Sequence, residues 1–370
     1  MRVLITGGAG FIGSHLVDRF CEQGFQVRVL DNLDPKIHPT GRPPLFPSGV
    51  EFIRGDVTDR ETLRDALRDI DVVSHQAAYQ DYMPDFSHFM KVNVGGTALL
   101  YELIVESRMR IKKVIVASSQ AVYGEGQYTC SEHGPFLPLP RSADQLKRKE
   151  WEVLCTSCGL RATANLLAEG QTNPYNQYAV SKLAQEKTAL GLGWLHGIPT
   201  VSLRYSITQG PRQSLFNHYS GICRIFVSRA LNSDPLIIYE DGKQTRDFVH
   251  IEDVVNANML VLEKDAANGQ AFNVGSGRVT TVLEYAELVR EKVKHEVEFR
   301  IPCEYRTGDN RNSVSSIAKL EALGWHPTHS LSEILDEFLE WIEQSGGVPR
   351  HIRDAYSHMK EAGVVLAAGQ

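Results

Sequence analysis

Short runs of aliphatic and β-branched residues alternate with amphipathic stretches through the first half of the chain. The apolar runs lie at residues 3–5, 27–30, 50–53, 72–74, 114–117 and 200–204, and the amphipathic stretches lie at 12–23, 61–68, 92–106 and 178–195. Continuous apolar runs are typical of strands buried on both faces, and helices between such strands connect them in parallel. The pattern therefore predicts a doubly wound α/β fold built on a parallel sheet.

Beyond residue 209 the pattern becomes less regular. Short strand candidates at 236–239, 248–250, 271–274 and 297–301 are mixed with helical patterns at 254–263, 282–292 and 331–343. We expect a first domain over residues 1–208 and a smaller α+β lobe over residues 209–370, with some segments of the second part returning to the first domain. The groove between the two parts is the expected ligand site. The tail at 361–370, which is rich in small residues, is expected to fray.

Composition and charge exclude several classes of partner. The 370 residues include 39 Lys and Arg against 45 Asp and Glu, so the net charge is −6, and no long basic run is present. This balance argues against a nucleic-acid partner. No apolar stretch approaches the ~20 residues that span a bilayer, and the first residues do not have the features of a secretion signal. Six cysteines are too few for a disulfide framework. The sequence thus predicts a cytoplasmic protein that binds neither nucleic acid nor membrane.

A glycine-rich turn follows the first predicted strand and opens the first predicted helix. It reads TGGAGFIG over residues 6–13, and such a turn lets a pyrophosphate approach the N–H groups at the start of the helix. Similar turns also occur without a ligand. Asp31 favours a turn that binds a dinucleotide, because it ends the second strand, where a carboxylate accepts hydrogen bonds from ribose hydroxyls. A carboxylate there repels a 2′-phosphate, so NAD is favoured over NADP. Asp56, after the third strand, either contacts the adenine or forms an Asx turn.

A tyrosine and a lysine stand four residues apart in the last amphipathic stretch of the first domain. Tyr178 and Lys182 share one helix face, and Ser118 and Ser119 follow the strand at 114–117, at the carboxyl edge of the sheet. A free phenol has a pKa near ~10, so a tyrosine base near neutrality needs a shift of ~3 units, or roughly 4 kcal/mol. A protonated lysine and a positively charged nicotinamide both favour the phenolate. A tyrosine and a lysine four residues apart are common in proteins and do not by themselves indicate an active site. The glycine turn, Asp31 and the two serines, which precede this pair in the sequence, favour a catalytic role for it.

In these motifs the chain resembles the extended short-chain dehydrogenases/reductases of the nucleotide-sugar epimerase/dehydratase family. The resemblance runs from Gly7 to about Trp325 and includes HQAA at 75–78, NVGGT at 93–97, LRY at 203–205, GPR at 210–212, RDFVH at 246–250 and LGW at 323–325. It implies a Rossmann-type fold with tightly held NAD, Tyr178 as catalytic base, Lys182 on the nicotinamide ribose and Ser119 on the sugar hydroxyl. The cofactor residues that it implies are Gly7, Gly10, Phe11, Ile12, Gly13, Asp31, Asn32, Asp56, Val57, Ala77, Ala78, Asn93, Ser118, Tyr178, Lys182 and Tyr205.

The resemblance also implies contacts with a nucleotide-diphosphate sugar. They are assigned to Ser119, Gln120, Asn217, Arg246 and Arg311, with the guanidinium groups facing phosphate oxygens. For both arginines an ordinary surface position is the alternative. Family members usually form homodimers through two long helices, which are expected here at 92–106 and 178–195.

The residues after the serine narrow the reaction. Dehydratases that resemble this chain carry an Asp-Glu pair where Gln120 and Ala121 stand, and sugar-acid decarboxylases usually carry a Glu at the position of Ala121. Neither Gln nor Ala transfers a proton, so the resemblance implies a 4-epimerase that oxidises C4 transiently, lets the 4-keto sugar turn and returns the hydride to the opposite face. A nucleotide-4-ketosugar reductase or another NAD(P)-dependent sugar-nucleotide oxidoreductase is the alternative, and a non-catalytic NAD-binding protein is a third interpretation.

Two departures from the family concern specificity and an insertion. Ser206 and Ile207 replace the usual Phe-Asn after LRY, so the phosphate contacts are rebuilt. The variant pattern is most similar to the dTDP-L-rhamnose 4-epimerase subgroup, with UDP-, GDP- and other dTDP-sugars left open. The second departure is a flap at about 125–176, which makes the interval between Tyr123 and Tyr178 54 residues long.

The flap contains two pairs of metal-ligand residues at close spacing. They are Cys130 and His133, then Cys155 and Cys158, which is a spacing typical of a structural zinc site. Four unrelated residues with thiols packed as small apolar groups are the alternative. A zinc ion here would fix the flap beside the mouth of the active site without taking part in the chemistry.

Overall fold

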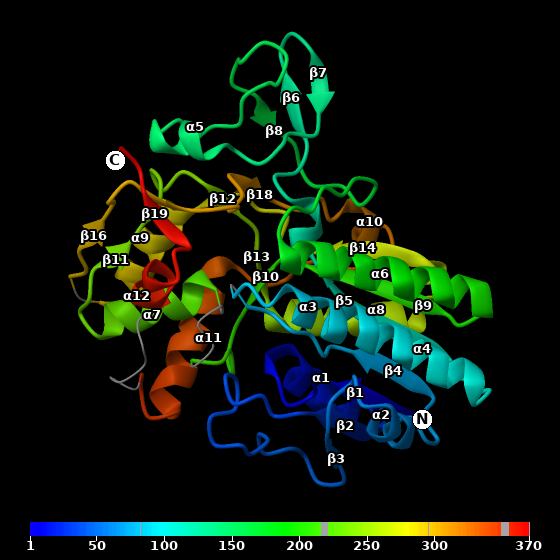
Figure 1. Cartoon of the computed structure of the whole chain (residues 1–370). Coiled ribbons are helices and arrows are strands. Elements are labelled where there is room, and N and C mark those ends of the chain that lie inside the picture. The colour runs from blue at the N-terminus through cyan, green and yellow to red at the C-terminus, as the bar shows by residue number, and fades with distance from the viewer. Residues whose placement is uncertain (82, 216–220, 295, 349–354, 370) are drawn as a thin grey trace.

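Seven parallel strands form the central sheet of the structure, a computed structural model that describes residues 1–81, 83–215, 221–294, 296–348 and 355–369 (Figure 1). In spatial order these strands are β14 (Gln270–Val274), β9 (Thr200–Tyr205), β5 (Lys113–Ser119), β4 (Val72–His75), β1 (Arg2–Thr6), β2 (Gln26–Asp31) and β3 (Glu51–Arg54). In register, Val3 lies opposite Val27 on one side and Val72 on the other. The Rossmann-type parallel sheet expected from the sequence is confirmed.

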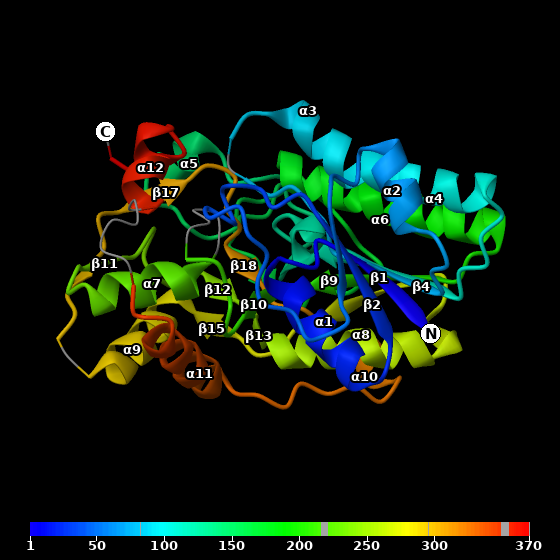
Figure 2. The same ribbon diagram turned by 90° about the horizontal axis from the view of Figure 1, so that it is seen from below.

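Helices cover both faces of this sheet (Figure 2). α1 (Phe11–Glu22) and α8 (Ile251–Glu263) lie on one face, and α2 (Arg60–Ala66), α4 (Gly96–Glu106) and α6 (Gln177–His196) lie on the other. Side chains alternate along β1, so that Val3 and Ile5 pack with α1 while Leu4 packs with α2 and α4. Burial on both faces explains why the strands are continuous apolar runs. Within the described ranges, no helix is both long enough and apolar enough to cross a membrane.

The stretch predicted as one helix at 92–106 is divided in the structure. Met90–Gly95 form a π-helical segment, η1, which follows α3 (Phe86–Phe89) and leads directly into α4. Asn93 in η1 is fully buried. Its side-chain amide donates to the carbonyl oxygen of Tyr79 at 3.0 Å and to Ser181 Oγ at 2.9 Å, and its oxygen accepts from the Tyr79 N–H at 2.7 Å. π-helical turns are often found near functional sites, and this one holds two elements of the site together.

A second apolar core lies in the smaller lobe. It is formed by α7 (Ile222–Leu231), α9 (Val282–Val293) and α11 (Leu331–Gln344), together with the short parallel strands β11 (Leu236–Ile237) and β16 (Phe299–Arg300). The two strands are shorter than the predicted 236–239 and 297–301. The helices α9 and α11 both begin with a capping box. The lobe also contains β10 (Ile207–Gln209), β12 (Thr245–Arg246), β13 (Phe248–His250), β15 (Thr280–Thr281) and β18 (Asn312–Ser313).

Part of the second half of the chain belongs to the first domain. α8 packs on α1, β14 completes the sheet beside β9, and α10 (Ala318–Glu321) contacts β14. Residues 361–369 of the C-terminal tail include a further strand, so the expectation that the tail frays was wrong for this described part. Its strand β19 (Val365–Ala367) follows α12 (Ala355–Glu361) and pairs antiparallel with β17 (Glu304–Arg306), and Val365 is buried against Met359.

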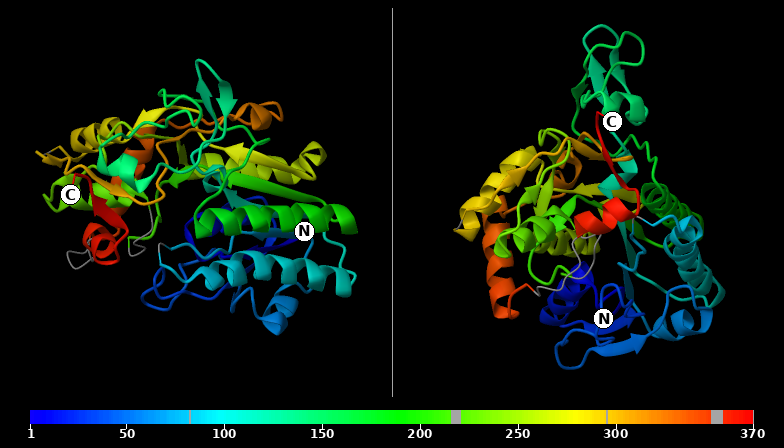
Figure 3. Two further views of the ribbon diagram at one scale, coloured as in Figure 1. Left: turned by 45° about the horizontal axis from the view of Figure 1, so that its top comes forward. Right: turned by 60° about the vertical axis from the view of Figure 1, so that its left-hand side comes forward.

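The insertion projects from the rest of the molecule (Figure 1 and Figure 3). Its outer part is a small antiparallel sheet of β6 (Tyr128–Cys130), β7 (Gly134–Phe136) and β8 (Thr163–Ala164), in the order β7-β6-β8. Its inner part carries α5 (Ala143–Lys147), where the carbonyl oxygen of Lys147 accepts a hydrogen bond from the N–H of Gly369 at 3.0 Å. The insertion therefore contacts the C-terminal tail at its base and extends away from the sheet at its tip.

Candidate active site

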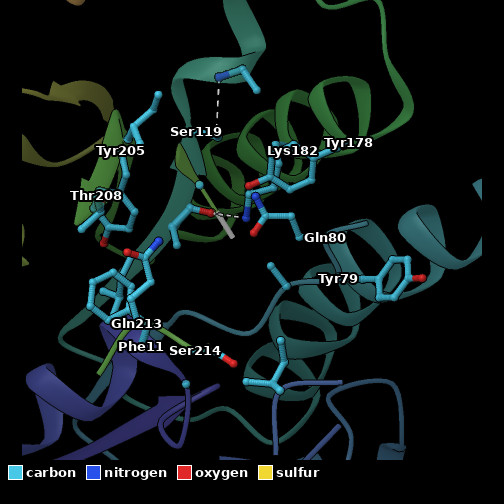
Figure 4. A pocket seen from close by; sticks show the side chains of 18 of the residues that line it. Phe11, Tyr79, Gln80, Ser119, Tyr178, Lys182, Tyr205, Thr208, Gln213 and Ser214 are labelled. Carbon is cyan, nitrogen blue, oxygen red and sulfur yellow. Dashed lines mark hydrogen bonds between the residues drawn. The ribbon is translucent and has the colours of Figure 1, made fainter. Parts of the chain in front are cut away.

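A large cavity lies at the carboxyl edge of the central sheet, between the first domain and the smaller lobe. Its volume is about 650 Å³, within the ~300–1,000 Å³ usual for small-molecule sites. It opens where the strand order reverses between β1 and β4, the place at which open α/β sheets bind ligands. In Figure 4, Tyr178, Lys182 and Ser119 face it from the first domain, with Thr208, Gln213 and Ser214 across from them.

The glycine turn forms one end of the cavity. Gly7 has φ +68°, and a Cβ added there would lie 2.8 Å from the backbone of Ala77. A Cβ at Gly13 would lie 2.2 Å from the carbonyl oxygen of Gly7, so the close packing of turn and helix requires both glycines. Gly10 is the N-cap of α1 and has no side chain to bind the first N–H groups. The positive end of the helix is thus left open to an anionic ligand.

Three polar side chains follow β2 and β3 at the same end. Asp31 accepts from the N–H of Ala9 at 3.0 Å and of Leu33 at 2.9 Å, which orients the carboxylate and leaves lone pairs for other donors. Asn32 donates to Asp56 at 3.0 Å. Asp56 also accepts a hydrogen bond from the N–H of Thr58 at 2.8 Å, so it forms an Asx-type turn, which was one of the two predictions for this residue. It also borders the cavity.

Ser119, Tyr178 and Lys182 meet at the middle of the cavity. Ser119 ends β5, and its hydroxyl accepts from the N–H of Ala121 at 3.1 Å and is hydrogen-bonded to the phenol of Tyr178. Lys182 Nζ donates to the carbonyl oxygen of Ala117 at 2.6 Å and to Gln185 Oε1 at 2.7 Å. The structure therefore brings the three predicted residues together on β5 and α6.

Burial controls the protonation of two of these groups. It raises the pKa of Tyr178 to about 12, and the hydrogen bond with Ser119 only partly opposes this rise. It lowers the pKa of Lys182 to about 7, against the attraction of Glu186. The phenol is therefore protonated at neutral pH in the chain alone, and Lys182, which is about half protonated there, does not by itself create a phenolate.

A buried ion pair supports the helix that carries Tyr178 and Lys182. Glu186 binds Arg204 with its two oxygens at 2.6 and 2.9 Å, and it also accepts from Ser118 Oγ at 2.8 Å. These contacts join α6 to β9 and β5. Gln185 and Glu186 were not predicted as site residues, although they lie three and four residues after Lys182 on the same helix face and could have been found from that spacing.

Three glutamines border the cavity with a buried amide oxygen that has no hydrogen-bond partner in the described part of the chain. They are Gln120, Gln213 and Gln244. A buried acceptor without a partner costs about 1–3 kcal/mol. Gln120 was predicted as a substrate contact. Gln213 and Gln244 were missed because they stand in loops outside any recognised motif.

Of the two predicted arginines, only Arg246 borders the cavity. Arg246 binds Asp309 at 3.1 Å. Burial raises the pKa of Asp309, but the guanidinium groups of Arg306 and Arg246 outweigh this and hold it at about 2. Arg311 lies outside the cavity lining and is fully buried among carboxylates of Glu152, Glu240 and Asp241. Its expected phosphate contact is therefore not supported by its position.

The remaining predicted residues are placed as follows. Asn93 is also outside the lining and acts as a support for Tyr79 and α6. Asn217 falls outside the described residues. The predicted cofactor residues that border the cavity are Gly7, Gly10, Phe11, Ile12, Gly13, Asp31, Asn32, Asp56, Val57, Ala77, Ala78, Ser118, Tyr178, Lys182 and Tyr205.

The predicted metal ligands come together but not at the cavity. The ligand atoms of Cys130, His133, Cys155 and Cys158 lie within 4.8 Å of one another. All four are absent from the cavity lining. The cluster therefore lies away from the candidate active site, in the outer part of the insertion.

Comparisons with known proteins agree with this geometry. Residues 3–143 and 159–275 match the NAD dependent epimerase/dehydratase family. The dTDP-L-rhamnose 4-epimerase of Burkholderia thailandensis is 31% identical over 350 residues, covering 93% of this chain and 95% of that protein. A structure of UDP-glucuronic acid 4-epimerase from Bacillus cereus, in complex with UDP-glucuronic acid and NAD, matches with a TM-score of 0.75 and 25% identity over 93% of this chain and 100% of that one.

A second solved structure gives the same result. UDP-glucose 4-epimerase from Thermus thermophilus, in complex with NAD, matches with a TM-score of 0.72 and 30% identity, covering 93% of this chain and 99% of that one. The sequence match spans both the glycine turn and the Tyr178–Lys182 pair. The chain therefore belongs to the NAD dependent epimerase/dehydratase family.

Proposed function

We propose that the protein is an NAD-dependent nucleotide-sugar 4-epimerase. The observation that carries this proposal is the meeting of Ser119, Tyr178 and Lys182 in one cavity with the glycine turn. The two positions after Ser119 hold Gln120 and Ala121, so the acid and base of a dehydratase are missing there. Reversible oxidation at one carbon is the reaction that this set of groups supports. The likeness to 4-epimerases of nucleotide sugars adds support.

The residues at the glycine turn fit NAD. The uncapped start of α1 suits a pyrophosphate, and the oriented carboxylate of Asp31 suits ribose hydroxyls and disfavours a 2′-phosphate. When bound, NAD supplies the carbon that takes a hydride from the sugar and gives it back. Asn32, Asp56 and Val57 would border the adenine end.

Tyr178 would hold the proton of the sugar 4-hydroxyl. In the proposed reaction the phenolate accepts that proton as the C4–H bond breaks, and returns it when C4 is reduced. Taking a phenol from a pKa of about 12 to neutrality requires roughly 7 kcal/mol. We propose that protonated Lys182 and the positive charge of the oxidised cofactor supply this stabilisation of the phenolate. The Ser119 hydroxyl would donate to the same sugar oxygen.

The cavity also suits the turning of a 4-keto sugar between oxidation and reduction. Its volume of about 650 Å³ leaves room for a sugar to present either face. Gln120, Gln213 and Gln244 border the cavity, and their side chains carry amide groups that can bond hydroxyl groups of the sugar. Arg246, on the lobe side, is the proposed contact of the diphosphate.

For the substrate, dTDP-L-rhamnose is the first compound to test, because the Burkholderia thailandensis relative carries that name. Ile207, where the family usually has Asn, has no amide group, and Ser206, where the family usually has Phe, donates its hydroxyl to Asp247 at 2.9 Å, which supports altered phosphate contacts. We also infer a homodimer through α4 and α6, since Trp194 and Leu195 on α6 are 83% and 64% exposed.

A cytoplasmic location is proposed from the low number of cysteines, all of them free.

Incubation with dTDP-, UDP- and GDP-sugars, with no added cofactor and with products resolved by NMR, tests the proposal. We expect inversion at C4 with one of them, and retention of deuterium placed at C4, because the hydride leaves and returns within one site. A requirement for stoichiometric reduced cofactor would identify a reductase instead. Failure of the whole panel, with NAD bound to the protein, would indicate a non-catalytic protein.

The role of Tyr178 has its own test. Tyr178→Phe should lower kcat by a factor on the order of 10²–10⁴. Tyr175→Phe, at a half-exposed tyrosine outside the cavity lining, serves as the matched control and should retain activity. Equal activity of the two variants would contradict the proposed base.

A further inference from the structure

Four side chains at the tip of the insertion form a compact set of soft ligands. Cys130 Sγ lies 3.6 Å from Cys158 Sγ and 3.7 Å from His133 Nδ1, and Cys155 Sγ lies 3.7 Å from His133 Nδ1. In a tetrahedral zinc site with Zn–S near ~2.3 Å and Zn–N near ~2.0–2.1 Å, ligand atoms are separated by about 3.5–3.8 Å. These three separations match edges of such a tetrahedron, and all four ligand atoms lie within 4.8 Å of one another.

The backbone presents the two pairs in the same way. Cys130 and His133 lie at the turn between β6 and β7, and the second pair lies in a turn closed by an antiparallel bridge between Leu154 and Arg161. The residue after each pair is a glycine in the left-handed region, Gly134 with φ +72° and Gly159 with φ +74°. Two equivalent turns that direct residues i and i+3 to one point are typical of zinc-ribbon sites.

The cysteine sulfur atoms are also placed as acceptors. The backbone N–H groups of Ser157 and Cys158 lie near the sulfur of Cys155, and that of Leu160 lies near the sulfur of Cys158, where they favour a negatively charged sulfur. N–H groups in such positions orient metal-bound ligands and stabilise their charge. They follow from the tight second turn, in which the N–H of Gly159 binds the carbonyl oxygen of Cys155 at 2.8 Å.

The tip does not have a hydrophobic core to hold it. Among the described residues, none of the hydrophobic clusters includes a member of 129–136 or 153–164. Most side chains from 156 to 164 are exposed. A segment of this size that buries so little apolar surface usually depends on a metal ion or a cross-link for its fold.

We propose that Cys130, His133, Cys155 and Cys158 bind one structural zinc ion. All four coordination positions are filled by the chain, so the site is closed to substrate. Cys155 and Cys158 lie in residues 144–158, which the family match omits, so the site belongs to the insertion rather than to the shared fold. This site is independent of the proposed epimerase activity.

The zinc site is connected to the wall of the cavity through the base of the insertion. Glu152, just before the second pair, binds Arg311 at 2.6 Å. Arg141 donates to the carbonyl oxygens of Trp151 at 2.9 Å and of Asp309 at 2.8 Å, and Asp309 borders the cavity. A metal ion that orders the tip would thereby hold the loop around Asp309 in place.

Metal analysis of the full chain, purified under reducing conditions without chelator, tests this proposal. We expect about one zinc per chain, and its loss in His133→Ala and in Cys158→Ser. Both residues are exposed, so their substitution should not prevent folding on other grounds. Cys21→Ser, a half-buried cysteine outside the cluster, is the matched control and should keep its zinc.

Two further measurements decide between a zinc site and other arrangements. Replacement by cobalt(II) should produce the visible bands of a tetrahedral thiolate site in the wild type and not in Cys158→Ser. Trypsin should cut after Arg161 faster once a chelator has removed the metal. No bound metal in a folded wild-type protein, or a Cys130–Cys158 disulfide in its place, would overturn the proposal.

Discussion

The buried pair of Glu186 and Arg204 leads to a prediction that links stability to the active site. Glu186→Gln keeps the shape of the side chain but leaves the guanidinium of Arg204, which is 2% exposed, without a counter-ion. At an effective dielectric constant of about 20, unit charges at the observed 2.6 Å attract each other by about 6 kcal/mol. Arg204 retains its bonds to the Tyr123 hydroxyl and the Glu169 carbonyl oxygen at 2.8 and 3.0 Å. We therefore expect a smaller loss, about 3–5 kcal/mol of unfolding free energy.

A second substitution separates the unpaired charge from the loss of packing. Adding Arg204→Met to Glu186→Gln removes the uncompensated charge. The double variant should therefore lose less unfolding free energy than the sum of the losses in the two single variants. The charge of Glu186 also opposes the effect of burial on Lys182. Its removal should take the pKa of Lys182 below about 7.

Urea unfolding followed by tryptophan fluorescence measures these free energies. Glu287→Gln is the matched control, because its carboxylate pairs with Arg290 at the surface, and its loss should stay below about 1 kcal/mol. A loss below about 1 kcal/mol for Glu186→Gln, or strictly additive losses in the double variant, would refute the reasoning.

Three other predictions concern protonation, cofactor choice and the insertion. The pKa of Lys182 is about 7 in the folded chain and ~10.4 in the unfolded chain, so the unfolded state holds more protons between pH 7 and pH ~10.4. The free energy of unfolding should therefore rise with pH in this range, by up to about 5 kcal/mol. Lys182→Met should lack this rise, and equal pH slopes in variant and wild type would contradict it. Asp31→Asn removes the charge that repels a 2′-phosphate, so the ratio of NADP to NAD dissociation constants should fall at least ~10-fold in binding titrations; an unchanged ratio would exclude that role. Arg141→Met frees the carbonyl oxygen of Asp309 and leaves Glu125 without its guanidinium partner, so KM for the sugar nucleotide should rise more than kcat falls. An unchanged KM in a folded variant would show that the insertion does not support the cavity wall.

The central sheet was predictable because its strands are buried on both faces, which leaves a local signature in each run. The π-helical turn at Met90–Gly95 was not, since its periodicity within six residues does not differ enough from that of an α-helix. The strand β19 was missed for a different reason. Its partner Glu304–Arg306 is distant in sequence, and pairing of this kind depends on tertiary contacts rather than on local propensity.

The centre of the candidate site was predictable for the same local reason. Tyr178 and Lys182 lie one helical turn apart, and Ser119 directly follows a buried strand. Arg246 and Arg311, by contrast, were both predicted as phosphate contacts, Arg311 as the second candidate, and only Arg246 borders the cavity. Their difference comes from tertiary partners, because Arg311 is surrounded by carboxylates from the insertion and the lobe.

The strand pairing of the C-terminal tail has a practical consequence for protein engineering. Tyr356 and Met359 of α12 contribute to the cavity wall, and β19 fixes the segment that follows them. A truncation after α11 would keep the helices of both apolar cores, yet it would remove these two side chains from the wall of the ligand pocket and open the pocket to bulk water. Affinity tags are therefore better fused to the amino terminus, because β1 begins at the opposite edge of the sheet from the pocket.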